Sequence, residues 1–117
     1  MNKVVCCREE FINNVYNLLI TNGLSQVDDS NVWIKEFEVR QGGAVVNING
    51  QQFQQPGEVI KIRYTLELIG EGTVDDTPFE QINFKVQHGD DVMIDMDECI
   101  YYDEVEIVNG IINQIFR

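Results

Sequence analysis

One histidine and three cysteines are the residues best suited to covalent chemistry. His88 lies at a predicted turn, and Cys6, Cys7 and Cys99 are the candidate nucleophiles. A nucleophilic thiol needs a base within hydrogen-bonding reach, and no local motif predicts that one of these cysteines meets His88. The glycine pair at residues 42–43 lies between expected strands, where it indicates a turn and not a phosphate-binding loop. The sequence therefore predicts neither an enzyme nor a bound cofactor.

Acidic side chains crowd one short segment near the C-terminus. Asp90, Asp91, Asp95, Asp97 and Glu98 fall within nine residues. Carboxylates are the ligands of hard cations, but a calcium loop needs acids at alternating positions around a central glycine, and no glycine follows Asp95. Asp95 and Asp97 instead share one face of a predicted strand, opposite its apolar face. We therefore expect an exposed acidic surface here and no metal ion.

The net charge of −12 comes from twenty acids and eight bases, and it is unevenly distributed. Residues 86–116 contain eight acids and no lysine or arginine. Such a surface repels nucleic acids and anionic membranes and favours a basic protein as partner. General solubility is the alternative explanation of the acidity, and the sequence leaves it open.

The sequence carries no sign of secretion or membrane insertion. An odd number of cysteines, two of them adjacent, does not suit a disulfide framework. The N-terminal segment lacks the apolar core of a signal peptide, and no apolar run reaches the length of a transmembrane helix. We expect a cytoplasmic protein, in the host cytoplasm if it is encoded by a phage.

Two helices are expected, one at each end of the chain. At residues 8–22 the apolar side chains recur with helical spacing, and Asn22-Gly23 provides a C-terminal stop. The second helix is expected to begin at Asp103, with Glu106 three residues later as in a capping box. Its apolar stripe consists of Val105, Val108, Ile111, Ile112 and Ile115.

Between the helices the pattern changes to strands. The runs expected to form strands are 32–40, 44–48, 51–54, 58–69, 81–88 and 92–97, with a hairpin turn at Asn49-Gly50. Residues 70–78 are expected to form a loop and residues 88–91 a turn. Apolar residues alternate with polar ones; those expected to face the core are Ile60, Ile62, Tyr64, Leu66, Leu68, Ile82, Phe84, Val86, Val92, Ile94 and Met96.

The short connections between strands predict a largely antiparallel sheet of about five strands. With a helix before it and a helix after it, the sheet suits a two-layer α+β fold in a single domain spanning residues 1–117, with both helices on the apolar face. On the polar face we expect Lys61, Arg63 and Lys85 to form cross-strand ion pairs with neighbouring acids.

Two functions are compatible with these features. The first is a non-enzymatic acidic protein that inhibits a basic protein, such as a toxin or a defence effector that binds nucleic acid. Tyrosines beside acids are typical of protein interfaces, and the expected contact residues are Asp90, Asp91, Asp95, Asp97, Glu98, Tyr101 and Tyr102. The alternative is a structural subunit of an oligomeric assembly, such as a phage virion or tail component, in which strand edges pair between neighbours. Homo-oligomerisation therefore stays open.

Overall fold

The computed structural model describes residues 7–41, 45–54 and 57–116, which form two helices and seven strands. In chain order these are α1 (Arg8–Thr21), β1 (Ser25–Gln26), β2 (Val32–Gln41), β3 (Val45–Ile48), β4 (Gln51–Gln54), β5 (Glu58–Val74), β6 (Thr77–His88), β7 (Asp91–Tyr101) and α2 (Val105–Ile115). Five strands form one antiparallel sheet in the order β1-β2-β5-β6-β7, and β3 and β4 form a separate hairpin. The predicted α+β class and the antiparallel five-stranded sheet are confirmed, and the chain is richer in strands than expected.

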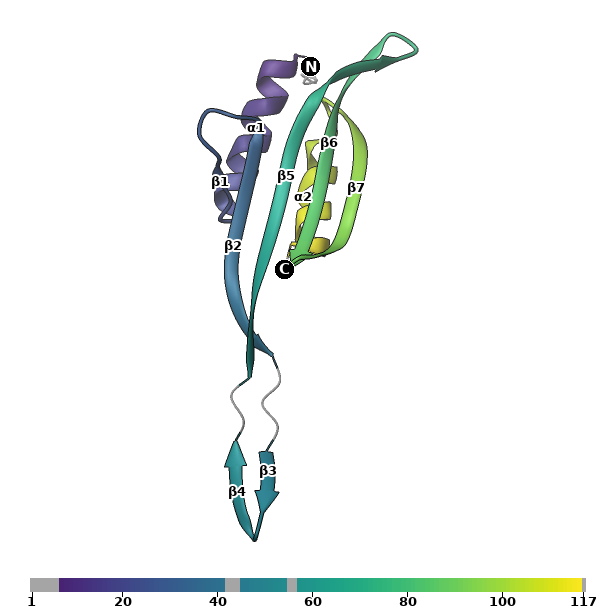
Figure 1. The fold of residues 1–117 in the computed structure, drawn as a ribbon. Coiled ribbons are helices and arrows are strands. Elements are labelled where there is room, and N and C mark those ends of the chain that lie inside the picture. Colours follow the sequence, from purple (N-terminus) through teal and green to yellow (C-terminus); the bar gives the residue numbers. More distant parts are fainter. Residues whose placement is uncertain (1–6, 42–44, 55–56, 117) are drawn as a thin grey trace.

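Both helices lie on the same face of the five-stranded sheet (Figure 1). α1 buries Phe11, Val15 and Leu19 at helical spacing, and α2 buries Val108 and Ile112. The strands supply alternate residues to this core, including Ile62, Tyr64, Leu66 and Leu68 of β5 and Ile82, Phe84 and Val86 of β6. Full burial of a large apolar side chain contributes roughly 1.5–3 kcal/mol relative to exposure. The alternation expected for residues 62–68 and 82–86 is confirmed.

The expected loop at residues 70–78 is wrong, because both strands continue through it. β5 runs to Val74, and β6 begins at Thr77 as its cross-strand partner. The two residues between them, Asp75 and Asp76, have φ angles of 49° and 63°. Positive φ at both central residues is the geometry of a two-residue hairpin turn. A bulge at Ile69 shifts the register just before the outer part of this hairpin, residues 70–81, which we call the β5–β6 ribbon.

Two local expectations near the C-terminus are also wrong. A second register shift leaves Met93 unpaired, so Val92 pairs with Gln87 and is exposed instead of sharing a face with Ile94. A bulge adds one residue to a strand and so reverses the inside–outside alternation beyond it. α2 begins at Val105 with Glu104 as its N-cap and no side-chain capping bond, so Asp103 is not the cap.

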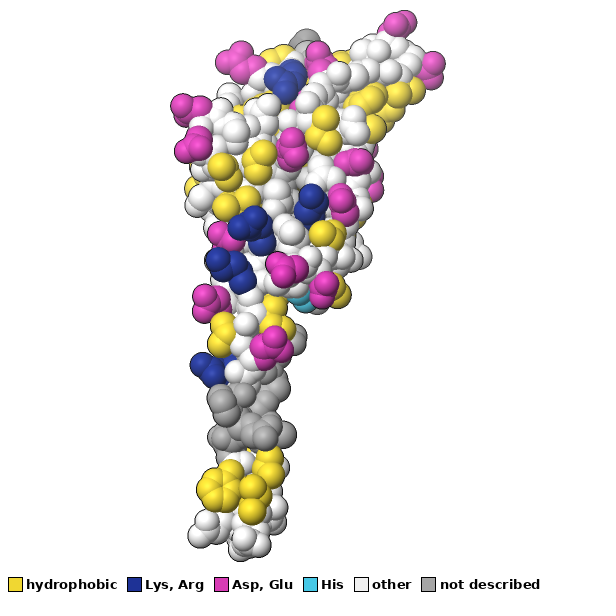
Figure 2. All heavy atoms as spheres, in the orientation of Figure 1, with side chains coloured by type: hydrophobic (Ala, Val, Ile, Leu, Met, Phe, Trp, Pro, Cys, Tyr) yellow, Lys and Arg dark blue, Asp and Glu magenta, His cyan; other side chains and the backbone are white. Residues whose placement is uncertain are grey.

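The opposite face of the sheet has no described helix over it, and we call it the open face (Figure 2). Here Arg63 of β5 forms an ion pair with Glu36 of β2, its cross-strand partner, at 2.7 Å. Lys85 of β6 is the cross-strand partner of Asp95 in β7. Cross-strand pairing of opposite charges on this face is therefore confirmed for Arg63.

The described chain is elongated, with extents of 75 × 28 × 27 Å and a radius of gyration of 19.7 Å. A compact domain of this length would have a radius of gyration of roughly 13 Å. The excess length arises because the β3–β4 hairpin extends beyond the ends of β2 and β5 (Figure 1). Neither helix in the described part of the chain combines the length and apolarity needed to cross a membrane.

Candidate interaction surfaces

Two of the predicted contact residues, Asp95 and Asp97, lie together on the open face. Both side chains are exposed on β7, and Asn83 of β6 donates a hydrogen bond of 2.8 Å to each carboxylate. Lys85 lies on the same face, as the cross-strand partner of Asp95. The Asn83 amide, which donates to both carboxylates, reduces the repulsion between them. The aspartate pair is therefore held in one arrangement on the sheet.

The other acidic contact residues lie away from this pair. Asp90 is in the turn between β6 and β7, and Asp91 begins β7. At about 3.3 Å per residue, Asp91 is roughly 20 Å from Asp97 along the strand. Glu98 pairs with the buried Ile82, so it lies on the helix-covered face. The predicted acidic residues therefore do not form one continuous surface.

The two tyrosines also separate. Tyr101 lies on the open face, where its ring meets the ring of Phe79 edge to face with centroids 6.3 Å apart. Tyr102 is buried, and its ring packs on Phe11 of α1 with centroids 5.2 Å apart. Only Tyr101 is therefore available to a partner on the open face.

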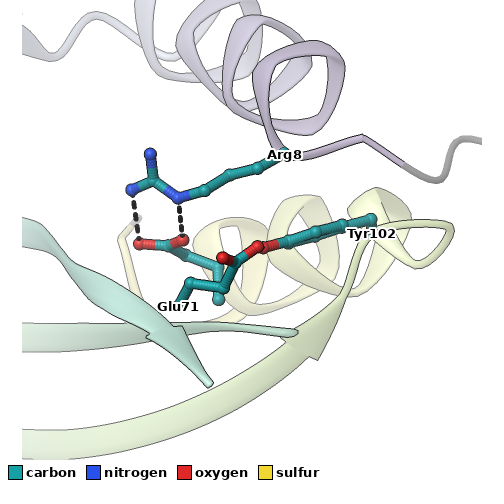
Figure 3. Close-up of polar contacts among 4 residues, drawn as sticks. Arg8, Glu71 and Tyr102 are labelled. Atoms are coloured by element: carbon teal, nitrogen blue, oxygen red, sulfur yellow. Dashed lines mark hydrogen bonds and ion pairs between the residues drawn. The ribbon is translucent and has the colours of Figure 1, made fainter. Parts of the chain in front are cut away.

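Tyr102 belongs to a polar cluster between the first turn of α1 and the β5–β6 ribbon (Figure 3). Its hydroxyl donates a hydrogen bond to a carboxylate oxygen of Glu71. Arg8 reaches from α1 to Glu80, donating from Nε at 2.8 Å and from Nη2 at 3.2 Å. Glu71 and Glu80 are cross-strand partners, so both carboxylates lie on the helix-covered face.

The contacts in this cluster shift the pKa values of Arg8 and Tyr102. The hydrogen bond with Glu80 raises the pKa of Arg8. Burial, followed by the hydrogen bond to Glu71, raises the pKa of Tyr102. Arg8 is therefore cationic and Tyr102 neutral at physiological pH. With its carboxylate fully buried and held by two hydrogen bonds, Glu80 joins the start of α1 to β6.

Glu80 was not anticipated from the sequence because residues 70–78 were expected to form a loop. The signal was present in the alternation of Ile82, Phe84 and Val86. Extending that pattern backwards by one step places Glu80 on the buried face. A charged residue at such a position needs a partner of opposite charge, and Arg8 supplies it.

The β3–β4 hairpin, residues 45–54, extends outside the body of the protein, and we call it the arm. The register pairs Val46 with Phe53 and Ile48 with Gln51, so these four residues share one face. Phe53 is 49% exposed and Ile48 is 52% exposed. No residue of the arm belongs to the buried core. The arm therefore presents an apolar face that nothing in the described chain covers.

A second apolar surface lies on the open face, at the end of the sheet farther from the arm. Outward-facing positions of a half-covered sheet are normally polar, yet several here are apolar. We define the outer strip as Val32, Ile34, Ile69, Val74, Phe79 and Tyr101, all exposed or half-buried. Ile69 and Val74 are 47% and 49% exposed. Figure 2 shows hydrophobic side chains at both ends of the molecule on this side.

The described thiols and His88 lie far apart. His88 ends β6, whereas Cys99 pairs with Gln81, seven residues away along that strand, which is roughly 23 Å. Cys7 is the N-cap of α1, where its Sγ accepts a hydrogen bond from a first-turn amide at 3.4 Å. Cys6 lies outside the described residues. Within the described ranges, no three His, Cys, Asp or Glu side chains are placed to hold a metal ion.

A shallow depression of about 350 Å³ lies beside the β6–β7 turn. Its lining consists of Lys61, Arg63, Gln87, Gly89 and Asp90. Two cations and one carboxylate surround the same space, and Arg63 is already paired with Glu36. Such a mixed lining does not select one class of small ligand.

The arm, the outer strip and the aspartate pair are the candidate interaction surfaces among the described residues. The first two are apolar, and the third is anionic. Known proteins add no further constraint, because no family model, no characterised sequence and no solved structure matches this chain significantly.

Proposed function

We propose that this protein is a structural subunit that assembles with further copies of itself, and that the arm makes the contact. The observation that carries the proposal is the apolar face of the arm, formed by Val46, Ile48 and Phe53 outside the core. No residue of the arm contributes to the buried core of its own chain. A neighbouring molecule that covers the arm would bury its apolar face.

The energetics of an isolated hairpin support a covering partner. A two-stranded hairpin alone in water is marginally stable at best. Ile48 and Phe53 are about half exposed, so covering each of them would recover about half of the roughly 1.5–3 kcal/mol that full burial contributes. A partner therefore stabilises both the contact and the hairpin itself.

The distribution of charge favours a second copy of the chain as that partner. Residues 41–57 contain no charged side chain, whereas the whole chain has a net charge of −12. Two such acidic molecules repel each other, and the repulsion is weakest where a contact brings no charges together. Interface cores are also depleted in charged residues. The arm has the composition of such a core. It carries no acidic side chain that would favour a basic partner.

Light scattering of purified protein tests the proposal. We expect the wild type to have a mass of several chains, and the Ile48→Thr/Phe53→Thr variant to be monomeric. Val45→Thr is the matched control, because Val45 is 61% exposed but lies on the opposite face of the arm. It should assemble like the wild type. A wild-type monomer at all concentrations, or unchanged assembly of the double variant, would contradict the proposal.

A second candidate function, inhibition of a basic protein, is supported by the aspartate pair. Asn83 holds Asp95 and Asp97 side by side on β7, whose outer edge is unpaired within the described sheet. Capture of a basic protein by the wild type, lost in Asp95→Lys/Asp97→Lys and kept in Glu106→Lys on α2, would support this function. Equal capture by all three proteins would exclude it.

A further inference from the structure

We infer that the arm of one copy docks on the outer strip of the next copy, head to tail. This inference rests on the proposed function and adds the surface that receives the arm. The arm needs an apolar, exposed surface, and the outer strip is such a surface on the same chain. A single contact, repeated between successive copies, then covers both the arm and the outer strip.

The outer strip is preformed around Gly72. A side chain at this position would place its Cβ 2.7 Å from the ring of Phe79, so that ring lies directly over the glycine backbone. Tyr101 meets the other side of the same ring edge to face. Ile69, displaced outwards by the bulge, and Val74 extend the apolar surface along β5. The receiving surface therefore requires no rearrangement to accept an apolar hairpin.

The distribution of charge favours the arm, and not the outer strip of a second copy, as the surface that packs on the outer strip. Glu67 and Asp97 border the strip on the open face, and Asp75 and Asp76 form the tip of its ribbon. Packing two strips against each other would bring these carboxylates together, and like charges in contact are strongly disfavoured. The uncharged arm brings no carboxylate to the same place. Packing two arms together would avoid the repulsion but would leave both strips exposed.

The arm of one molecule cannot reach the outer strip of the same molecule. The arm lies beyond the Glu58 end of β5, and Gly72 lies fourteen residues from Glu58, near the other end of the strand (Figure 1). At about 3.3 Å per residue this separation is roughly 46 Å. A contact between two different surfaces of identical chains is heterologous, so it repeats and generates a ring or a filament. We therefore expect assemblies larger than a dimer.

Complementation between two defective variants tests the inference. The arm variant is Ile48→Thr/Phe53→Thr, and the strip variant is Ile69→Thr/Phe79→Thr. Each alone should raise the concentration for half-assembly by more than about tenfold. Mixed in equal amounts, they should form a dimer and nothing larger, because one intact arm then meets one intact strip. Ile20→Thr, an exposed apolar position on α1, is the control and should assemble like the wild type.

The outcomes separate the inference from the proposed function. Normal assembly of the strip variant with loss of assembly in the arm variant would overturn the docking site and leave self-assembly intact. Normal assembly of both variants would overturn both. A mixture that stays monomeric would overturn head-to-tail docking. Circular dichroism checks folding, and if the strip double variant is unfolded, Ile69→Asn alone replaces it.

Discussion

The buried ion pair between Arg8 and Glu80 makes a sharp prediction about stability. Arg8→Met removes two hydrogen bonds, of 2.8 and 3.2 Å, and leaves a carboxylate that is 0% exposed without its cation. Removing one partner of a buried pair costs about 3–5 kcal/mol. The Arg8 side chain is 43% exposed, so water can reach the vacated position and reduce the cost. We expect the free energy of unfolding to fall by about 2–3 kcal/mol.

Urea unfolding at pH 7 measures this loss, at one fixed protein concentration because assembly also shifts apparent stability. The double variant Arg8→Met/Glu80→Leu should recover most of the lost stability, since it leaves no buried charge unpaired. Arg63→Met is the matched control. Its ion pair with Glu36 has a similar length, 2.7 Å, but both side chains are partly exposed. We expect no measurable change in that variant.

Two results would refute this reasoning. The first is an Arg8→Met variant as stable as Arg63→Met, which would mean that burial of Glu80 does not govern the energy of the pair. The second is a double variant no more stable than Arg8→Met, which would mean that the lost stability came from the packing of the arginine stem.

The remaining predictions concern single side chains. Tyr102→Phe should lower the free energy of unfolding by about 1 kcal/mol in urea at neutral pH, because the hydrogen bond to Glu71 is lost. Because the pKa of Tyr102 is raised in the folded protein, the stability gained from its neutral hydroxyl is complete below the ordinary tyrosine pKa of 10.0 and is lost as the pH rises above that value. Alkaline titration should therefore destabilise the wild type more steeply than the Tyr102→Phe variant. Gly72→Ala should push the Phe79 ring off the outer strip and weaken assembly in light scattering, while circular dichroism stays unchanged. Asn83→Ala removes the donor shared by two aspartates, and its destabilisation in urea should shrink as salt is added.

Hydrophobic alternation was sufficient to predict the centre of the sheet. At residues 60–68 of β5 and 82–86 of β6 each inward position, such as Leu66 and Phe84, is apolar, and each intervening position is polar, so only one register buries the apolar set. The helical stripes were equally clear, because Phe11, Val15 and Leu19 repeat at one helical face. These elements follow from local pattern alone.

Irregular positions were not predictable in this way. The bulges at Ile69 and Met93 are set by how neighbouring strands meet, and no single-strand pattern reports them. The glycines at residues 70 and 72 suggested a loop, yet Gly72 lies in a strand where the Phe79 ring fills the space that a side chain would occupy. The strand ribbon that carries Glu71 and Glu80 was therefore missed.

The arrangement of the predicted contact residues followed from the sequence only in part. The expectation that Asp95 and Asp97 share a strand face is confirmed. Clustering in sequence also grouped Glu98 and Tyr102 with them, although alternation places Glu98 on the other face and Tyr102 in the core. The absence of charge from residues 41–57 was visible in the sequence, but its meaning depends on the arm lying outside the core.

Hydrogen exchange of the arm amides, measured at several protein concentrations, tests the central claim most directly. An uncovered two-stranded hairpin opens freely, so its amides exchange rapidly. If another copy covers the arm, residues 45–54 should become protected as concentration rises through the assembly range, and Ile48→Thr/Phe53→Thr should abolish that protection. Exchange in the arm that is fast and identical at every concentration would contradict the claim.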